Sequence, residues 1–394
     1  MTPAKAWTIV GLFTLAYWGT STDPQYPILL PNFLSGHYEI GTGAASLPIV
    51  FASLGAIIGT LVSGLLARRH GIGLLIFINL WAFVALSFVN AVEGPFSIFC
   101  LTRFFTGLFQ GGLSLLFLLG VGVLVPPERR GVGVGVLTSG AMLAALAIPL
   151  LVIATKEPES AMWRMPFAVF GVAALIGVLG LHGVRMPLRP GHESEESHVA
   201  RLLRSRRMVA LLALGGLLLT SIVAMGSTFP IFMDRRFDKD LPDCIWQVVT
   251  LGVGAVVGAL ISGKATDRFG PRIILIWTSI VVTPIFAVVP LLATSPVAVY
   301  PVFFVMSATA AARVPPYQAL MLRVIPERAR GPVLGIRNTI SYAGTALGAG
   351  AGAWLFEVFD SYLAVALFAA VMSAVTLTVI WRHVPRRIEL HMMG

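Results

Sequence analysis

Residues 254–272 read GAVVGALISGKATDRFGPR, an apolar stretch that ends abruptly in a charged turn containing glycine. The same skeleton occurs 199 residues earlier, and so does a second motif. The matched positions are Gly254/Gly55, Gly258/Gly59, Ser262/Ser63, Gly263/Gly64, Gly270/Gly71, Pro326/Pro127, Glu327/Glu128 and Arg328/Arg129. Matches at one fixed offset in a chain about twice that long indicate two tandem copies of one unit. The sequence therefore predicts a duplicated half.

The composition requires a bilayer as the solvent of most of the chain. Of 394 residues, 57% are hydrophobic and only 12% are charged. Apolar segments of about 20 residues recur, each long enough to cross the hydrocarbon as a helix. The first of them, after Lys5, is too long for a signal-peptide core, so we expect it to be retained. We predict twelve spans, at 7–31, 42–66, 72–91, 95–125, 132–154, 162–184, 208–233, 244–263, 272–293, 296–323, 332–356 and 361–381.

The basic residues are distributed unevenly between the two sides of these spans. With the N-terminus inside, 20 Lys and Arg fall on the cytoplasmic side and 5 on the outer side. Basic residues favour the cytoplasmic side, so we expect an inner-membrane protein with both termini cytoplasmic. This bias explains the net charge of +10 without a nucleic-acid partner.

One long polar stretch, 185–207, predicts a cytoplasmic linker between a bundle at 1–184 and a second bundle at 208–394. Its segment 192–198, HESEESH, mixes acids and histidines, but the spacing fits no metal template, so we interpret it as solvated. The two cysteines, Cys100 and Cys244, have neither disulfide nor metal spacing. No phosphate-binding loop is present, so we expect no cofactor and no direct ATP hydrolysis.

The repeated turn and the twelve spans in two halves resemble the major facilitator superfamily. Residues 263–272, GKATDRFGPR, are similar to the family motif Gly-x-x-x-Asp-Arg-x-Gly-x-Arg/Lys after the second span of a half. Arg103 with two following glycines also resembles the family's fourth-span motif. The resemblance implies an all-α integral membrane fold of twelve helices in two pseudo-symmetric six-helix bundles. It further implies a monomeric transporter, not an enzyme.

In this family the turn motif helps to close the cytoplasmic side. The resemblance therefore implies a conformational switch made of Gly263, Asp267, Arg268, Gly270 and Arg272, together with Arg69 of the first copy. The first copy departs from the motif, because Arg68 replaces the acid. The fifth-span glycine-proline motif of proton-driven drug exporters is also missing, since residues 141–149 read AMLAALAIP.

Charged side chains inside a bilayer are costly and mark functional sites. Asp23 and Arg103 fall at similar heights in the outer half of their spans, which makes them candidates for proton coupling. Asp23 would change charge as its surroundings alternate between dry and wet. The alternatives are a fixed Asp23–Arg103 ion pair, or a cap on the backbone broken at Pro24.

Arg313 falls near the midplane, just before Pro315 and Pro316, where a helix should break. Its half of the chain offers no embedded acid, so the simplest partner is an anionic substrate. The alternative is that Arg313 bonds backbone carbonyls around the double proline. Polar residues that could orient a ligand, or else join helices, are Tyr17, Gln110, Ser114, Tyr317, Gln318, Asn338 and Tyr342. Arg337 lies near an inner end of its span.

These features favour a secondary active transporter that moves a small organic solute by alternating access, with an organic anion and proton coupling through Asp23 as the specific hypothesis. The alternative is a proton-driven exporter of amphipathic or cationic drugs, which should carry more than one embedded acid. A receptor or scaffold on the same fold is a third class, and it should carry an appended soluble domain.

Overall fold

The computed structural model describes residues 3–22, 34, 37–40, 47–143, 147, 161–182, 202–239, 245–326 and 329–384. Every regular element within these ranges is a helix, and nine of the described helical stretches are long and apolar enough to cross a membrane. The other three predicted spans contain the helices α1 (Pro3–Thr22), α7 (Arg130–Met142) and α17 (Arg330–Phe359). The expected all-helical, multi-pass fold is confirmed.

The chain forms two compact units. Unit 1 comprises Met1–Val125 and Gly140–Glu193, and unit 2 comprises Pro126–Ser139 and Ser194–Gly394. The segment 126–139 therefore packs with the second unit, although the sequence analysis groups it with the first bundle. The exact bundle boundaries 1–184, 185–207 and 208–394 stay a prediction. The segment 192–198 lies outside the described residues.

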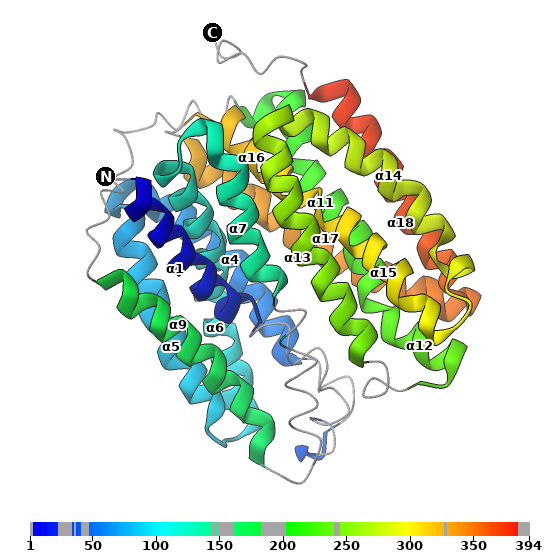
Figure 1. The fold of residues 1–394 in the computed structure, drawn as a ribbon. Coiled ribbons are helices and arrows are strands. Elements are labelled where there is room, and N and C mark those ends of the chain that lie inside the picture. Colours follow the sequence, from blue (N-terminus) through cyan, green and yellow to red (C-terminus); the bar gives the residue numbers. More distant parts are fainter. Residues whose placement is uncertain are drawn as a thin grey trace. The chain divides into compact units, whose positions relative to one another are not determined.

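Unit 1 is built on the pairing of α4 with α6 and of α9 with both α1 and α5 (Figure 1). A Cβ atom on Gly59 would overlap the carbonyl group of Leu108, and one on Gly107 would overlap that of Ala52. The small residues of α4 and α6 thus bring the two backbones into direct contact. The main helices are α1, α4 (Leu47–His70), α5 (Ile72–Ala91), α6 (Phe96–Leu124) and α9 (Met165–His182), the last preceded by the 3-10 turn η3 (Ala161–Arg164).

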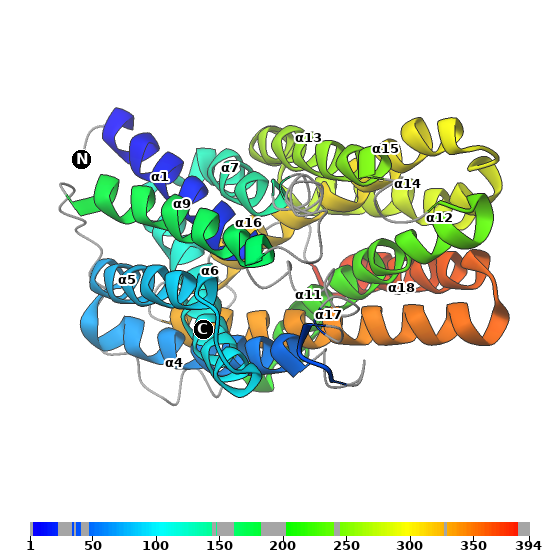
Figure 2. The same cartoon turned by 90° about the horizontal axis from the view of Figure 1, so that it is seen from below.

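Unit 2 repeats this scheme. α13 packs on α15, α11 on α17, and α14 on α18 (Figures 1 and 2). A Cβ atom on Gly258 would overlap the carbonyl group of Ala308, as the duplication of Gly59 predicts. The helices are α11 (Arg206–Ser227), α12 (Phe229–Phe237), α13 (Ile245–Phe269), α14 (Pro271–Leu292), α15 (Pro296–Ala311), α16 (Val314–Val324), α17 and α18 (Tyr362–His383), with η2 (Pro127–Arg129) and the first part of α7.

The repeated turn has the same backbone conformation in both units. Gly71 precedes α5 with φ 85°, and Gly270 precedes α14 with φ 87°. Side chains other than glycine rarely adopt this region, because the Cβ atom meets the backbone. The two glycines that mark the repeat in the sequence therefore occupy equivalent, glycine-requiring positions.

The helix contacts of unit 2 generate a prediction from two glycines in α17. A Cβ atom on Gly348 would lie 2.9 Å from the Cα of Thr220, whereas one on Gly350 would meet no atom within 4 Å. We expect Gly348→Ala to lower the free energy of unfolding by about 1–3 kcal/mol through overpacking. Gly350→Ala should leave it unchanged or raise it by up to about 1 kcal/mol. Denaturant titration of the purified variants measures both, and equal effects would contradict the described packing of α11 against α17.

Candidate functional site

The acid of the turn motif caps a distant helix. One carboxylate oxygen of Asp267 accepts the backbone N–H of Gly131 at 2.6 Å, and the other accepts that of Val132 at 2.8 Å. These amides lie at the start of α7, where no partner exists within the helix. A negative charge is also stabilising at a helix N-terminus. Asp267 thus joins the end of α13 to the start of α7.

Close approach of these two helices depends on glycine. A Cβ atom on Gly263 would lie 2.8 Å from the carbonyl oxygen of Gly131 and 3.0 Å from the Cα of Gly135. A Cβ atom on Gly131 would lie 2.6 Å from the Asp267 carboxylate. The glycines therefore set the distance at which the carboxylate reaches the amides.

The other residues of the predicted switch have different surroundings. The Arg272 Nε donates to the carbonyl oxygen of Val384 at 2.8 Å, at the end of α18. Arg268 is exposed and its guanidinium lies 5.1 Å from the ring centroid of Phe269. Arg69 is exposed in unit 1. Of the predicted switch residues, Gly263 and Asp267 are the ones that contact α7 in the described part of the chain.

Arg313 lies inside unit 2 with 0% of its surface exposed. Its Nε donates to the carbonyl oxygen of Ala310 at 3.3 Å, and its two terminal nitrogens donate to the hydroxyls of Ser373 and Ser221, each at 3.1 Å. Its guanidinium also lies 5.5 Å from the ring centroid of Phe286. All these partners are neutral, so the cation joins α11, α14 and α18 to the start of α16.

A second buried arginine lies beside two of the predicted site residues. The guanidinium of Arg337 lies 5.1 Å from the ring centroid of Tyr317 and donates to the amide oxygen of Asn338. Its Nε is buried and has no acceptor among the described residues. Tyr317 in turn donates its hydroxyl proton to the carbonyl oxygen of Leu211 at 3.0 Å. The structure thus brings Tyr317, Arg337 and Asn338 together.

From the sequence, Arg337 was predicted only as a charge near an inner end of its span. The signal that could have identified Arg337 is its position seven residues before Gly344. This spacing places it on the same face of α17 as the glycines that pack against α11. Gln318 lies near this cluster along α16, where its amide oxygen accepts the hydroxyl proton of Thr138 at 3.2 Å. Tyr342 is half-buried one turn beyond Asn338.

Four residues of unit 1 that were predicted for proton coupling or substrate binding, Tyr17, Arg103, Gln110 and Ser114, lie on α1 and α6. Arg103 is 0% exposed, with its guanidinium 5.3 Å from the ring centroid of Phe167. Gln110 is buried, and Ser114 donates to the carbonyl oxygen of Gly111 at 2.8 Å. The ring of Tyr17 contacts that of Phe117 edge-on, with 5.8 Å between the centroids. Asp23 lies outside the described residues, so its pairing with Arg103 stays a prediction.

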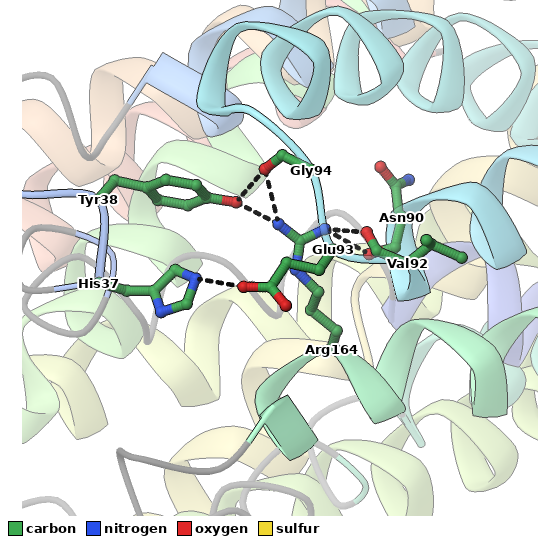
Figure 3. Close-up of polar contacts among 7 residues, drawn as sticks. All are labelled: His37, Tyr38, Asn90, Val92, Glu93, Gly94 and Arg164. Carbon is green, nitrogen blue, oxygen red and sulfur yellow. Dashed lines mark hydrogen bonds and ion pairs between the residues drawn. The ribbon is translucent and has the colours of Figure 1, made fainter.

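A polar cluster that the sequence analysis missed holds together three connections of unit 1 (Figure 3). The guanidinium of Arg164 donates to the carbonyl oxygens of Asn90, Val92 and Gly94 and to the hydroxyl of Tyr38. We call these residues the Arg164 cluster.

The Arg164 cluster is enclosed by aromatic rings. The guanidinium lies 4.6 Å from the ring centroid of Trp163 and 5.3 Å from that of Phe99. Burial raises the pKa of Tyr38 above its ordinary value, so its hydroxyl keeps its proton and donates to Gly94. Beside it, His37 lies 3.8 Å from the carboxylate of Glu93. The cluster therefore fixes the segment around 38, the turn 90–94 and the start of α9.

Metal binding finds no support in the described part of the chain. Among those residues, no three His, Cys, Asp or Glu side chains gather closely enough to hold an ion. Cys100 is buried and free, while Cys244 lies outside the described residues.

Comparison with known proteins covers nearly the whole chain. The family model described as Major Facilitator Superfamily matches residues 8–245 and 224–390. The inner membrane transport protein YdhP of Escherichia coli (strain K12) is 24% identical over 375 residues, which cover 92% of each chain. A chloramphenicol resistance protein of Streptomyces lividans is 27% identical over 349 residues, covering 82% of this chain and 81% of the relative.

A solved structure shows the same fold. The proton:xylose symporter XylE, bound to 6-bromo-6-deoxy-D-glucose, superposes with a TM-score of 0.80 at 16% identity. The superposition covers 98% of this chain and 97% of that one. At this identity the likeness concerns the architecture alone.

The Asp267 contact predicts local loosening of α7. We expect Asp267→Ala to lower the free energy of local opening at residues 126–139 by about 0.5–2 kcal/mol, as removal of a helix cap does. Hydrogen–deuterium exchange followed by mass spectrometry should then show faster exchange in peptides from this segment. Asp360→Ala, which removes an exposed acid paired with Arg235, is the matched control and should leave these peptides unchanged. Equal exchange in both variants would refute the cap.

The Arg164 cluster predicts that replacing Arg164 destabilises the protein much more than replacing the exposed Arg235 does. Arg164 is buried, whereas Arg235 forms an exposed ion pair with Asp360 at 2.5 Å. Arg164→Gln should lower the free energy of unfolding by at least about 1.5–3 kcal/mol, because buried carbonyls lose a charged donor. Arg235→Gln should lower it by no more than about 1 kcal/mol. Thermal denaturation in detergent compares the two, and similar melting temperatures would contradict the structural role of the cluster.

Proposed function

Because this chain belongs to the major facilitator superfamily, a family of transporters, we propose that it is a secondary active transporter for a small organic anion. In this proposal it works by alternating access and couples transport to protons. It is a multi-pass membrane protein. We further propose an inner-membrane location with cytoplasmic termini, supported by the basic-residue bias and by its relative YdhP, which is named an inner membrane transport protein.

The observation that carries the anion hypothesis is a pair of buried cations in unit 2. Arg313 and Arg337 are 0% and 6% exposed, and their partners among the described residues are all neutral. A charged side chain at the centre of a membrane helix costs about 2.5–3.5 kcal/mol or more. An anionic substrate would supply the missing countercharge.

Of these two arginines, Arg337 is the stronger candidate for direct contact. Its Nε has no acceptor within the described residues, and Tyr317 and Asn338 adjoin it with groups that can orient a ligand. Arg313 uses all three of its nitrogens on protein acceptors, which an anion would have to displace. We therefore propose that Arg337 binds the anion and that Arg313 shapes the helices around it.

The remaining predicted residues keep their proposed roles. Gln318 and Tyr342 of unit 2, and Tyr17, Gln110 and Ser114 of unit 1, are proposed to orient the substrate by hydrogen bonds. Asp23 is proposed to carry the coupled proton, with Arg103 setting its affinity for that proton.

The contact between Asp267 and α7 is the proposed conformational switch. The carboxylate bonds two backbone amides directly, so separation of α13 from α7 must break both bonds at once. Substrate binding can drive such a step only if the substrate binds the two states with different affinities.

A proton-driven drug exporter is the second candidate. The observation that favours it is the relative named a chloramphenicol resistance protein. The single acid within the predicted spans of the first half and the departure at residues 141–149 from the exporter motif argue against it.

The test is a thermal-shift screen of purified protein against carboxylates, organic phosphates, amines and dyes, with chloramphenicol included. A ligand at 100 times its Kd stabilises the native state by about 2.7 kcal/mol, which raises the melting temperature. We expect carboxylates or phosphates to stabilise the wild type and to lose this effect in Arg337→Gln. Arg235→Gln, which alters an exposed arginine of the same unit, should respond as the wild type does.

A proteoliposome assay then follows uptake of the stabilising compound. An imposed pH gradient should accelerate uptake in the wild type and fail to do so in Asp23→Asn. Stabilisation by amines or chloramphenicol alone, unchanged in Arg337→Gln, would replace the anion hypothesis with the exporter.

A further inference from the structure

A groove of about 330 Å³ runs along one face of unit 2, between α13, α14 and α15. Large side chains border it and remain open to the surroundings, with Ile261 65% and Trp277 62% exposed. Both belong to helices long and apolar enough to cross a membrane, so we infer that lipid tails and not water contact this face.

Small residues make the groove hollow. Gly258 and Ala265 of α13 and Ala308 of α15 line its floor, where larger side chains would fill the space between the three helices. Gly258 packs directly on the backbone of Ala308, so the two helices are in direct contact there. The shape is therefore built into the packing of α13 on α15.

The groove has three hydroxyl-bearing residues but no polar lining. Ser262 donates to the carbonyl oxygen of Ala259 at 3.2 Å, Thr278 to that of Ile274 at 2.7 Å, and Thr309 to that of Val305 at 2.8 Å. Each hydroxyl is thus satisfied within its own helix. A polar solute would find no free hydrogen-bond partner among these hydroxyls, whereas a hydrocarbon chain needs none.

Cations lie just beyond the inner end of the groove. Arg268 follows Ala265 by three residues and Ile261 by seven, so it continues the same face of α13. Lys264 flanks this face one turn earlier, and both side chains are exposed. Neither has an ion-pair partner within the described ranges, and Arg268 is held against the ring of Phe269.

From this arrangement we propose that the groove is a binding site for one anionic phospholipid. An acyl chain fills the apolar groove, and the headgroup phosphate is bound by Arg268 and Lys264 at the membrane surface. Basic side chains between membrane helices favour anionic headgroups. The site differs from the proposed substrate site, since no groove residue belongs to the cluster of Tyr317, Arg337 and Asn338.

Native mass spectrometry of the full-length, delipidated protein tests the proposal by measuring the affinity for added lipid. Phosphatidylglycerol should bind at least tenfold more tightly than phosphatidylcholine with the same acyl chains. The Lys264→Gln/Arg268→Gln double variant should lose most or all of this preference for phosphatidylglycerol. Arg235→Gln, which removes an exposed cation at the end of α12, a helix that contributes no residue to the groove, is the matched control and should bind as the wild type does.

Two further measurements distinguish the contribution of the acyl chain from that of the headgroup. Thr278→Phe should fill the groove and weaken binding of both lipids, with folding checked by its melting temperature without lipid. Soluble glycerol phosphate should neither bind measurably nor displace the lipid, because it lacks the acyl chain. The proposal is overturned if the double variant keeps the full preference for phosphatidylglycerol, if Thr278→Phe binds as tightly as the wild type, or if glycerol phosphate displaces the lipid.

Discussion

The absence of water from the bilayer interior is the constraint on which the rest of this structure depends. A polar group there must find its partner within the protein. Most span hydroxyls therefore bond a carbonyl of their own helix, as Thr60 and Thr220 do, and each of these two also bonds the facing helix. The same constraint explains why Arg313 is surrounded by two serines and a carbonyl, and why an open position at Arg337 has functional meaning.

The sequence was most informative where a feature is local or repeated. The glycines at 71 and 270 marked a turn that has one backbone conformation in both units, because only that residue type suits it. Hydrophobic length predicted the spans, and the repeat predicted that positions 59 and 258 are equivalent, as their close helix contacts are. Contacts between residues distant in the chain could not be predicted from the sequence. The motif acid at 267 was predicted to belong to a conformational switch, but its partner, the start of α7, came only from the structure.

The partners of the buried arginines could not be predicted from the sequence either, for a physical reason. A charge within a predicted span signals an unusual environment, yet one-dimensional spacing does not say whether hydroxyls, rings or a ligand compensate it. Arg313 was predicted to face a substrate and is found with neutral protein partners, so its binding role stays a hypothesis. Arg164 could not be predicted as a structural centre, because an arginine near a span end is ordinary and its acceptors, the carbonyls of the turn 90–94 and the hydroxyl of Tyr38, lie far from it in the sequence.

The Arg164 cluster also constrains how this protein can diverge. The start of α9 supplies one guanidinium that donates to both the segment around Tyr38 and the turn 90–94, so the three connections meet at a single set of donors. A residue inserted into the turn 90–94 or into the segment around Tyr38 would move acceptors away from the guanidinium, and one inserted at the start of α9 would move the donor away from both. Connections usually tolerate changes in length. In unit 1 these three connections are therefore constrained in length by one another, which makes them poor sites for tags, epitopes or fused domains.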